Sequence, residues 1–146
     1  MAVGFGPMRA VPALTRDELL AWVAAHDDAW RTNDPEAIGR LFSEDGIYRL
    51  GPWEGPWRGH TGPIFGRDAI VEVWTSTFDP DERFTADAEV VAIDGRRGVI
   101  QRKITYESVA GHPGSRYGCL WVVDIDEQGR CSEYQEWYVE EPRLGP

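Results

Sequence analysis

The chain has 146 residues, a formal net charge of −10 and two cysteines, and its length predicts one domain that buries about two thirds of its unfolded surface. The acidic balance and the lack of a long basic stripe argue against a nucleic-acid partner, and no apolar run reaches the roughly 18 residues that a membrane span needs. Two cysteines are too few for a disulfide scaffold and the first residues do not resemble a secretory signal, so we expect reduced thiols in a cytoplasmic protein.

Helical spacing dominates the first half of the sequence. Thr15 and Glu18 form a capping box, and Asp34 can cap a second helix whose first position is Pro35. The apolar stripe of the first helix includes His26, which is therefore expected to point into the interior. We expect helices over residues 15–33, through residues 38–42 and from about residue 67 onward, with a short strand at residues 47–50.

Alternating, β-branched runs follow residue 81, and turn signals separate them. Three helices followed by strands in hairpins predict an α+β domain, with the helices packed on one face of a curved antiparallel sheet. This single domain is expected at residues 15–140, between an N-terminal arm, 1–14, and a C-terminal tail, 141–146. The expected strands cover residues 83–93, 98–109, 116–125 and 131–140.

Aromatic residues gather in a Gly/Pro-rich segment, residues 51–66, and along the last two expected strands. Seven tryptophans in a chain of this length need a core, a pocket or an interface to hold them. A deep aromatic pocket would suit a flat, apolar small molecule, whereas the simpler alternative is that the rings fill a small core. We expect Trp22, Trp30 and Trp74 to pack between the helices and the sheet, and Trp137 to lie on the outer face of the sheet. The expected walls of the pocket are Trp53, Trp57 and Trp121.

Several short segments resemble a known superfamily: the junction Asn33-Asp34-Pro35-Glu36, residues 41–46 before the first strand, and residues 66–70 at the start of the third helix. With the long first helix, they are similar to the nuclear transport factor 2 superfamily, and in it to the SnoaL-like branch of polyketide cyclases and relatives of ketosteroid isomerases. The resemblance covers residues 15–140. It implies a cone-shaped α+β barrel around a cavity and dimers through the sheet face, but the superfamily holds many different enzymes and several proteins with no activity.

The site of the ketosteroid isomerases is not kept in this chain. Those enzymes use an Asp general base and an oxyanion hole made of a Tyr and a protonated Asp. The resemblance places His26 at the position of the Tyr, about Leu50 at that of the base and about Trp121 at that of the acid. We therefore do not expect steroid isomerisation.

A carboxylate on the last strand is the first candidate for chemistry. A turn at residues 126–129 would place Cys119 opposite Glu136 and Trp121 opposite Tyr134, all on one face of a hairpin. By resemblance this face lines the cone, and apolar surroundings suit a carboxyl group for general acid or base work. The alternatives are an ion pair between Glu136 and a cation of a neighbouring strand such as Lys103, or a reversed parity that turns Glu136 to water.

His26 is the second candidate, because its place on the apolar stripe suits an interior proton-transfer residue. The alternative is a hydrogen-bonded core histidine. Asp27 is the next residue along the helix, so we expect it to face about 100° away and to take no direct part.

Further residues are expected around the ligand. By alignment the polar set of the second long strand faces the cavity; it consists of Gln101, Lys103, Thr105 and Glu107. There Gln101 and Lys103 would bind a substrate carbonyl or carboxylate, and the alternative is a solvated sheet face. Tyr48 is expected at the mouth of the cone, beneath a lid that carries Trp53 and Trp57.

Metal and nucleotide sites are not expected. His26, His60 and His112 fall in a helix, a loop and a turn, and none has the close spacing to a second ligand that zinc motifs show. The glycines of residues 51–66 alternate with Pro and Trp rather than forming a phosphate-binding loop. We therefore expect no metal and no cofactor.

The sequence thus supports two hypotheses of function. The preferred one is a cofactor-free, SnoaL-like pocket protein that acts by proton transfer on an apolar cyclic or polyketide-like molecule, as an isomerase, cyclase, dehydratase or epoxide hydrolase. The alternative is a non-catalytic domain that binds a ligand or a protein and forms a homodimer through the sheet face. The expected site consists of His26 and Glu136 as catalytic groups and of Tyr48, Trp53, Trp57, Gln101, Lys103, Cys119, Trp121, Tyr134 and Tyr138 as substrate-binding residues.

Overall fold

The structure is a computed structural model that describes residues 4, 6, 7, 9–51, 56, 57, 60–109, 111 and 113–142, with the backbone alone at 56, 57, 60 and 61. The side chains of Trp53 and Trp57, expected as a lid, therefore lie outside the described residues.

The three expected helices are confirmed. Helix α1 spans Arg16–Thr32, and its capping box is complete: the Thr15 N–H donates to Glu18 Oε2 at 2.8 Å, and the Glu18 N–H donates to Thr15 Oγ1 at 3.1 Å. Helix α2 spans Pro35–Leu41 behind its Asp34 cap, and α3 spans Arg67–Ser76. No described helix is long and apolar enough to cross a membrane.

Seven strands form one sheet in the order β4-β1-β9-β8-β7-β5, with β6 also paired to β7, and β2 and β3 form a separate pair. The expected α+β class is confirmed, but the sheet is mixed rather than purely antiparallel, because β1 runs parallel to β9, and it is not closed. The strands are β1 Phe42–Leu50, β2 Pro56–Trp57, β3 His60–Thr61, β4 Ile64–Phe65, β5 Phe84–Ala86, β6 Glu89–Asp94, β7 Arg97–Tyr106, β8 Ser115–Ile125 and β9 Cys131–Glu140.

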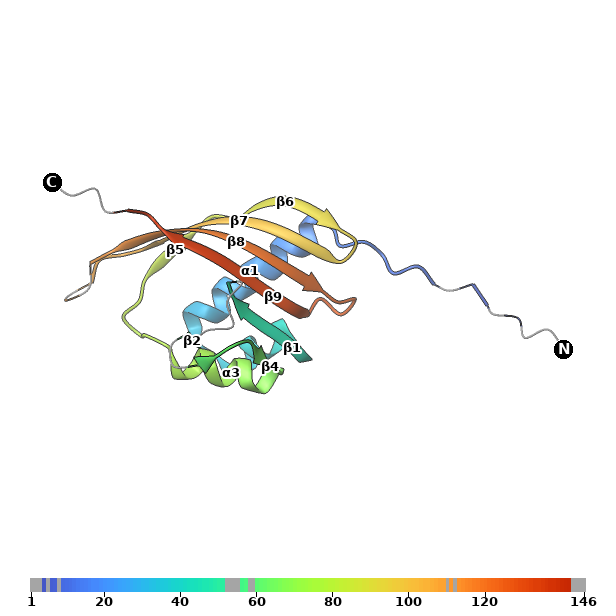
Figure 1. Cartoon of the computed structure of the whole chain (residues 1–146), viewed down its shortest axis with the longest axis horizontal. Coiled ribbons are helices and arrows are strands. Elements are labelled where there is room, and N and C mark those ends of the chain that lie inside the picture. Colours follow the sequence, from blue (N-terminus) through green and yellow to red (C-terminus); the bar gives the residue numbers. More distant parts are fainter. Residues whose placement is uncertain are drawn as a thin grey trace.

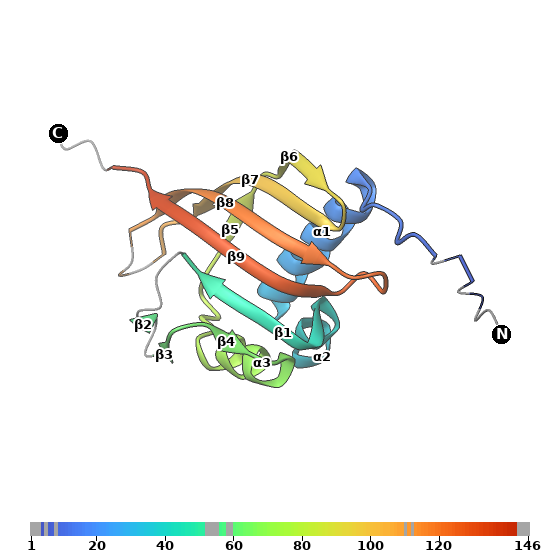
Figure 2. The ribbon, with the colours of Figure 1, turned by 45° about the vertical axis from the view of Figure 1, so that its right-hand side comes forward.

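All three helices lie on one side of the curved sheet, with α1 crossing β7 and β8 (Figures 1 and 2). The core fills the space between them, where Leu19 and Val23 of α1 and Ile100 and Val123 of the sheet are buried. Gly98 lets α1 approach the sheet, since a Cβ at this position would lie 2.5 Å from Leu19 Cδ2.

The hairpin of β8 and β9 keeps the expected face but not the expected register. Cys119 lies opposite Tyr138, and Trp121 opposite Glu136, two residues away from the prediction. The cause is the turn: the Asp126 N–H donates to the Arg130 carbonyl at 2.7 Å, and the pairing is irregular next to it. A shift by two residues leaves every side chain on its original face, so the shared face survives.

On β7 the predicted parity is wrong. Gln101 and Lys103 lie on the exposed face, and the side chains that point inward are Ile100, Arg102 and Ile104. Burial of the two isoleucines favours this orientation. The cost of burying the arginine is offset by hydrogen bonds to Asp27 of α1. Gln101 and Lys103 therefore do not line the cavity described next.

Candidate active site

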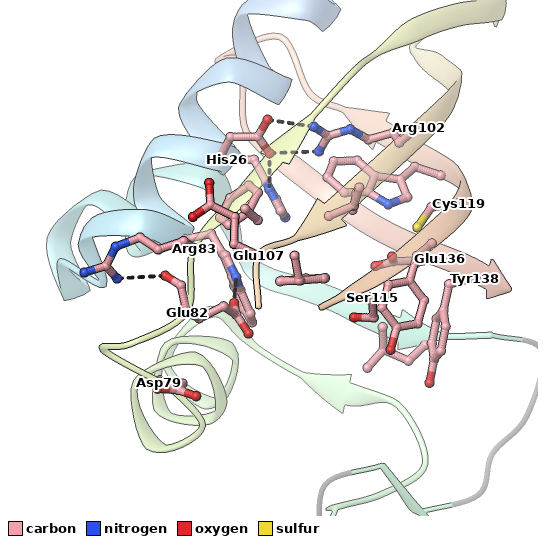
Figure 3. Close-up of a pocket in the computed structure, with 18 of the residues that line it drawn as sticks. His26, Asp79, Glu82, Arg83, Arg102, Glu107, Ser115, Cys119, Glu136 and Tyr138 are labelled. Atoms are coloured by element: carbon pink, nitrogen blue, oxygen red, sulfur yellow. Dashed lines mark hydrogen bonds and ion pairs between the residues drawn. The ribbon is translucent and has the colours of Figure 1, made fainter. Parts of the chain in front are cut away.

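A cavity of about 410 Å³ lies between α1, the inner face of β7, β8 and β9, and the segment that leads from α3 into β5 (Figure 3). The expected residues that line it are His26, Tyr48, Cys119, Trp121, Tyr134, Glu136 and Tyr138. The structure thus brings together both expected catalytic groups and five of the expected binding residues around one cavity.

His26 points into the interior, as expected, and is only 6% exposed. Its ring packs against Trp121, with 4.5 Å between centroids, and lies nearly parallel to the ring of Tyr134. Nδ1 lies 3.4 Å from Asp27 Oδ1, and since a carboxylate only accepts, Nδ1 carries the hydrogen. Nε2 is then a lone-pair acceptor, buried and without a partner among the described residues.

Burial lowers the pKa of His26, against the opposing effect of the Asp27 carboxylate. The imidazole is therefore neutral at neutral pH. In this state it accepts a proton, so His26 cannot serve as the cationic acid of an acid/base pair.

Asp27, of which no direct part in proton transfer is expected, lines the cavity beside His26 and is held in an ion pair. Arg102 reaches across from β7, and its Nη1 and Nη2 donate to the two carboxylate oxygens of Asp27 at 2.8 and 2.6 Å. Arg102 also donates from Nε to the Asp87 carbonyl at 3.0 Å, and its guanidinium lies 4.3 Å from the centre of the Trp121 ring. Each nitrogen of this cation, which is 1% exposed, thus has a hydrogen-bond partner.

The pKa of Asp27 is about 2, because hydrogen bonds from His26 and Arg102 outweigh burial, which alone would raise it. The sequence held a signal for this ion pair. Arg102 alternates with Ile100 and Ile104 on one strand, and a buried arginine among apolar residues requires an acid nearby. Asp27 lies on the helix that covers this strand.

Glu136 projects into the cavity from β9, beside Trp121 of β8, and the Tyr134 hydroxyl donates to its Oε2 at 2.5 Å. Tyr48 stacks on Tyr134 with 4.5 Å between ring centres. Burial, helped by the Glu136 charge, raises the pKa of Tyr134 well above its usual value, so the phenol stays protonated as a donor. Among the described residues no cation forms an ion pair with Glu136, and Lys103, its expected alternative partner, lies on the other face of the sheet.

Cys119 adjoins this carboxylate but is not a nucleophile. Burial, with the Glu136 charge second, raises the pKa of the thiol to about 12. Both cysteines are buried and free. Cys119 thus serves as a small, protonated wall residue.

Tyr134 connects the two expected catalytic residues. Its ring stacks on His26 at 5.9 Å between centroids, and its hydroxyl donates to Glu136. His26 and Glu136 therefore share one cavity without touching each other.

Sequence reasoning missed the charged residues at the other end of the cavity, because they come from irregular segments without periodicity. Glu82 Oε1 accepts a hydrogen bond from Trp30 Nε1 at 2.9 Å, so Trp30 lines the cavity in addition to packing on Trp74. The missed residues are Asp79, Glu82 and Arg83, whereas Glu107, which lines the same end, belongs to the polar set that was expected to face the cavity. In the described part of the chain no three His, Cys, Asp or Glu side chains are grouped as metal ligands.

The fold defines a class, the small α+β domains in which helices cover one face of a strongly curved sheet. The family model described as "SnoaL-like domain" matches residues 23–134, and the chain therefore belongs to the SnoaL-like family of the nuclear transport factor 2 superfamily.

Solved structures agree with this assignment. An LEH-like epoxide hydrolase of Mycobacterium tuberculosis has a TM-score of 0.64 at 15% identity, over 84% of either chain. A protein of unknown function with a cystatin-like fold from Methylobium petroleophilum has a TM-score of 0.67 at 18% identity, over 91% of this chain and 82% of the other. A putative ketosteroid isomerase from Kribbella flavida has a TM-score of 0.59 at 15% identity, over 89% and 84%. At these identities the likeness is one of fold, and no curated protein matches the chain.

Proposed function

We propose that this chain is a cofactor-independent enzyme that transfers protons on an apolar cyclic molecule bound in the cavity, by isomerase, cyclase, dehydratase or epoxide hydrolase chemistry. One observation carries the proposal. The Glu136 carboxylate lies on an aromatic cavity wall, accepts a hydrogen bond from Tyr134, and has no ion-pair partner among the described residues.

Glu136 is the proton-transfer group that faces the substrate. It takes a proton from a substrate carbon, or from a water molecule, and returns it to another atom once protonated. Tyr134 holds the carboxylate in place, because its hydroxyl stays protonated and donates throughout. A single carboxyl group that moves a proton in this way suffices for an isomerisation.

His26 is a second, uncharged proton acceptor in the same cavity. Asp27 fixes its tautomer through Nδ1, and the lone pair on Nε2 lacks a partner among the described residues. An unsatisfied buried acceptor of this kind costs about 1–3 kcal/mol, which is reasonable where a bound ligand supplies the missing hydrogen.

The test uses a generic carbon acid, 5-nitrobenzisoxazole, a small neutral aromatic molecule. A base removes the ring C–H proton, the N–O bond breaks, and the electron pair ends on a phenolate oxygen that is followed by absorbance. A positioned general base contributes about 10²–10⁴-fold, so Glu136→Gln should lower kcat/KM by at least about 100-fold.

The matched control is Glu140→Gln, which removes an exposed carboxylate from the same strand and should leave the rate unchanged. A wild-type rate no higher than that of Glu136→Gln, with both proteins folded, refutes the proposal and favours a non-catalytic ligand-binding domain.

The outer face of the sheet supports a separate proposal, that two copies of the chain pair through it. Leu120 of β8 lies opposite Trp137 of β9, and Val139, next to them, is 73% exposed. Exposed apolar side chains on neighbouring strands favour an interface. Sedimentation velocity of wild type and of Val139→Asp tests it: a dimer that becomes a monomer is expected, and a monomeric wild type contradicts it.

A further inference from the structure

The charges that line the cavity do not balance. With His26 neutral, the lining holds an excess of three negative charges. Arg102 and Asp27 neutralise each other, so the excess lies elsewhere. The carboxylates are those of Asp27, Asp79, Glu82, Glu107 and Glu136, and the guanidinium groups are those of Arg83 and Arg102.

Arg83 does not neutralise the acidic end formed by Asp79, Glu82 and Glu107. Its Nη1 donates to the backbone carbonyls of Pro80 and Glu82 at 2.8 and 3.0 Å. Figure 3 shows its guanidinium at the outer edge of the site, directed away from Glu136. Among the described residues none of the three carboxylates of this end has an ion-pair partner.

Aromatic rings adjoin the same end. Trp30 holds the Glu82 carboxylate through its indole N–H, and Phe84 and Tyr106 contact each other with 6.0 Å between centroids. The faces of such rings carry negative potential and attract cations, and the Arg31 guanidinium already lies 4.5 Å from the centre of the Phe84 ring. Carboxylates beside ring faces are the surroundings that recognise an organic ammonium group.

A second observation points to an occupant of the cavity. His26, 6% exposed, and Trp121, 1% exposed, both line it, and His26 Nε2 and Trp121 Nε1 are an acceptor and a donor without partners among the described residues. Their rings contact each other at 4.5 Å between centroids. Buried polar atoms of this kind are normally satisfied, which favours a ligand whose inner end offers a polar hydrogen to Nε2 and a lone pair to Nε1.

We propose that the cavity takes a small protonated amine that carries an apolar ring, with the ammonium group at Glu82 and Glu107 and the ring against Phe84 and Tyr106. This rests on the proposed function in that the same cavity holds the substrate. The amine lies at the acidic end, which leaves Glu136 for proton transfer, and the same negative field repels carboxylated analogues.

Three probes of matched shape test the proposal by calorimetric titration: 2-phenylethylamine, 2-phenylethanol and 3-phenylpropanoate. At low salt the amine should bind at least about tenfold more tightly than the alcohol, the acid should bind most weakly, and the preference should shrink as salt rises. Equal or tighter binding of the alcohol or the acid, or no binding of any probe at millimolar concentration, overturns the proposal.

Variants locate the ammonium group. Glu82→Gln with Glu107→Gln should abolish the preference for the amine and leave the Kd of the alcohol unchanged. The control, Glu127→Gln with Glu140→Gln, removes the same net charge from exposed positions and should keep the preference. A preference that survives the Glu82/Glu107 pair of substitutions refutes the assigned position.

The two proposals fail separately. Glu136→Gln should retain the preference for the amine while it loses proton abstraction from 5-nitrobenzisoxazole. If the wild type shows the amine preference but no proton abstraction, the proposed function fails and the ligand class stands. If it shows proton abstraction but no amine preference, the ligand class fails alone.

Discussion

The cavity has two charged regions that are built in opposite ways. Between α1 and β7, Arg102 and Asp27 form a bidentate pair, and the hydrogen-bonding groups of the cation have protein partners. On β9, Glu136 accepts a hydrogen bond from Tyr134 and has no counter-ion among the described residues. The charges of the first region stabilise the fold, whereas the second region keeps a charge that is available to a ligand.

The difference teaches which buried charges are candidates for function. A buried ion pair whose hydrogen bonds are complete is evidence of a structural role, even when it lines a cavity. A carboxylate that the protein positions but does not neutralise is a better candidate for chemistry. His26 lies between the two kinds, since Asp27 fixes one nitrogen and the other remains open.

The largest effect is expected from Asp27→Asn, which leaves the Arg102 cation buried without its counter-ion. Removal of one partner from a buried pair costs about 3–5 kcal/mol of unfolding free energy, measured by urea titration. Asp28→Asn is the matched control, because the neighbouring carboxylate is 80% exposed, and it should stay within about 0.5 kcal/mol of wild type. Equal effects of the two substitutions would contradict a structural role for the pair.

A smaller effect is expected from pH. Because burial lowers the pKa of His26, the unfolded chain binds this proton more readily, and stability is lost as the pH falls below about 6.5. Asp27, with a pKa of about 2 against an ordinary 3.8, adds a further loss between about pH 4 and 2. Urea titrations should give a constant unfolding free energy from pH 8 to 7 and a loss of about 1 kcal/mol by pH 5.5.

His26→Gln separates the two contributions to this pH dependence. The variant should flatten the profile between pH 7 and 5.5 and keep the loss below pH 4, which belongs to Asp27. An unchanged slope near pH 6 would show that another group binds the proton.

The sequence predicted the helices, the long strands and one face of the β8–β9 hairpin, because capping residues and period-two alternation are local signals. It failed at β1, whose parallel pairing with β9 joins residues far apart in the chain, and at the register of the hairpin, which an irregular turn sets. Local patterns hold no information on either.

The candidate site was predicted in part for the same reason. His26, Trp121 and Glu136 follow from periodicity along single elements, and they line one cavity. Gln101 and Lys103 were assigned inward because they are polar and the resemblance suggested it, but two isoleucines decided the parity. The Asp27–Arg102 pair joins α1 to β7, so its geometry depends on how helix and sheet pack.

The smallest effect on stability is expected from Glu136→Gln, which removes the charge that the fold does not use. Glutamine keeps an oxygen that accepts the Tyr134 hydroxyl, and no buried cation is left unpaired, so the unfolding free energy should change by less than about 1 kcal/mol. Urea titration beside Asp27→Asn makes the comparison within one experiment. A loss of about 3–5 kcal/mol, the range expected for Asp27→Asn, would place Glu136 among the structural charges. An unchanged or raised stability is the result expected of a carboxylate that is available to a ligand.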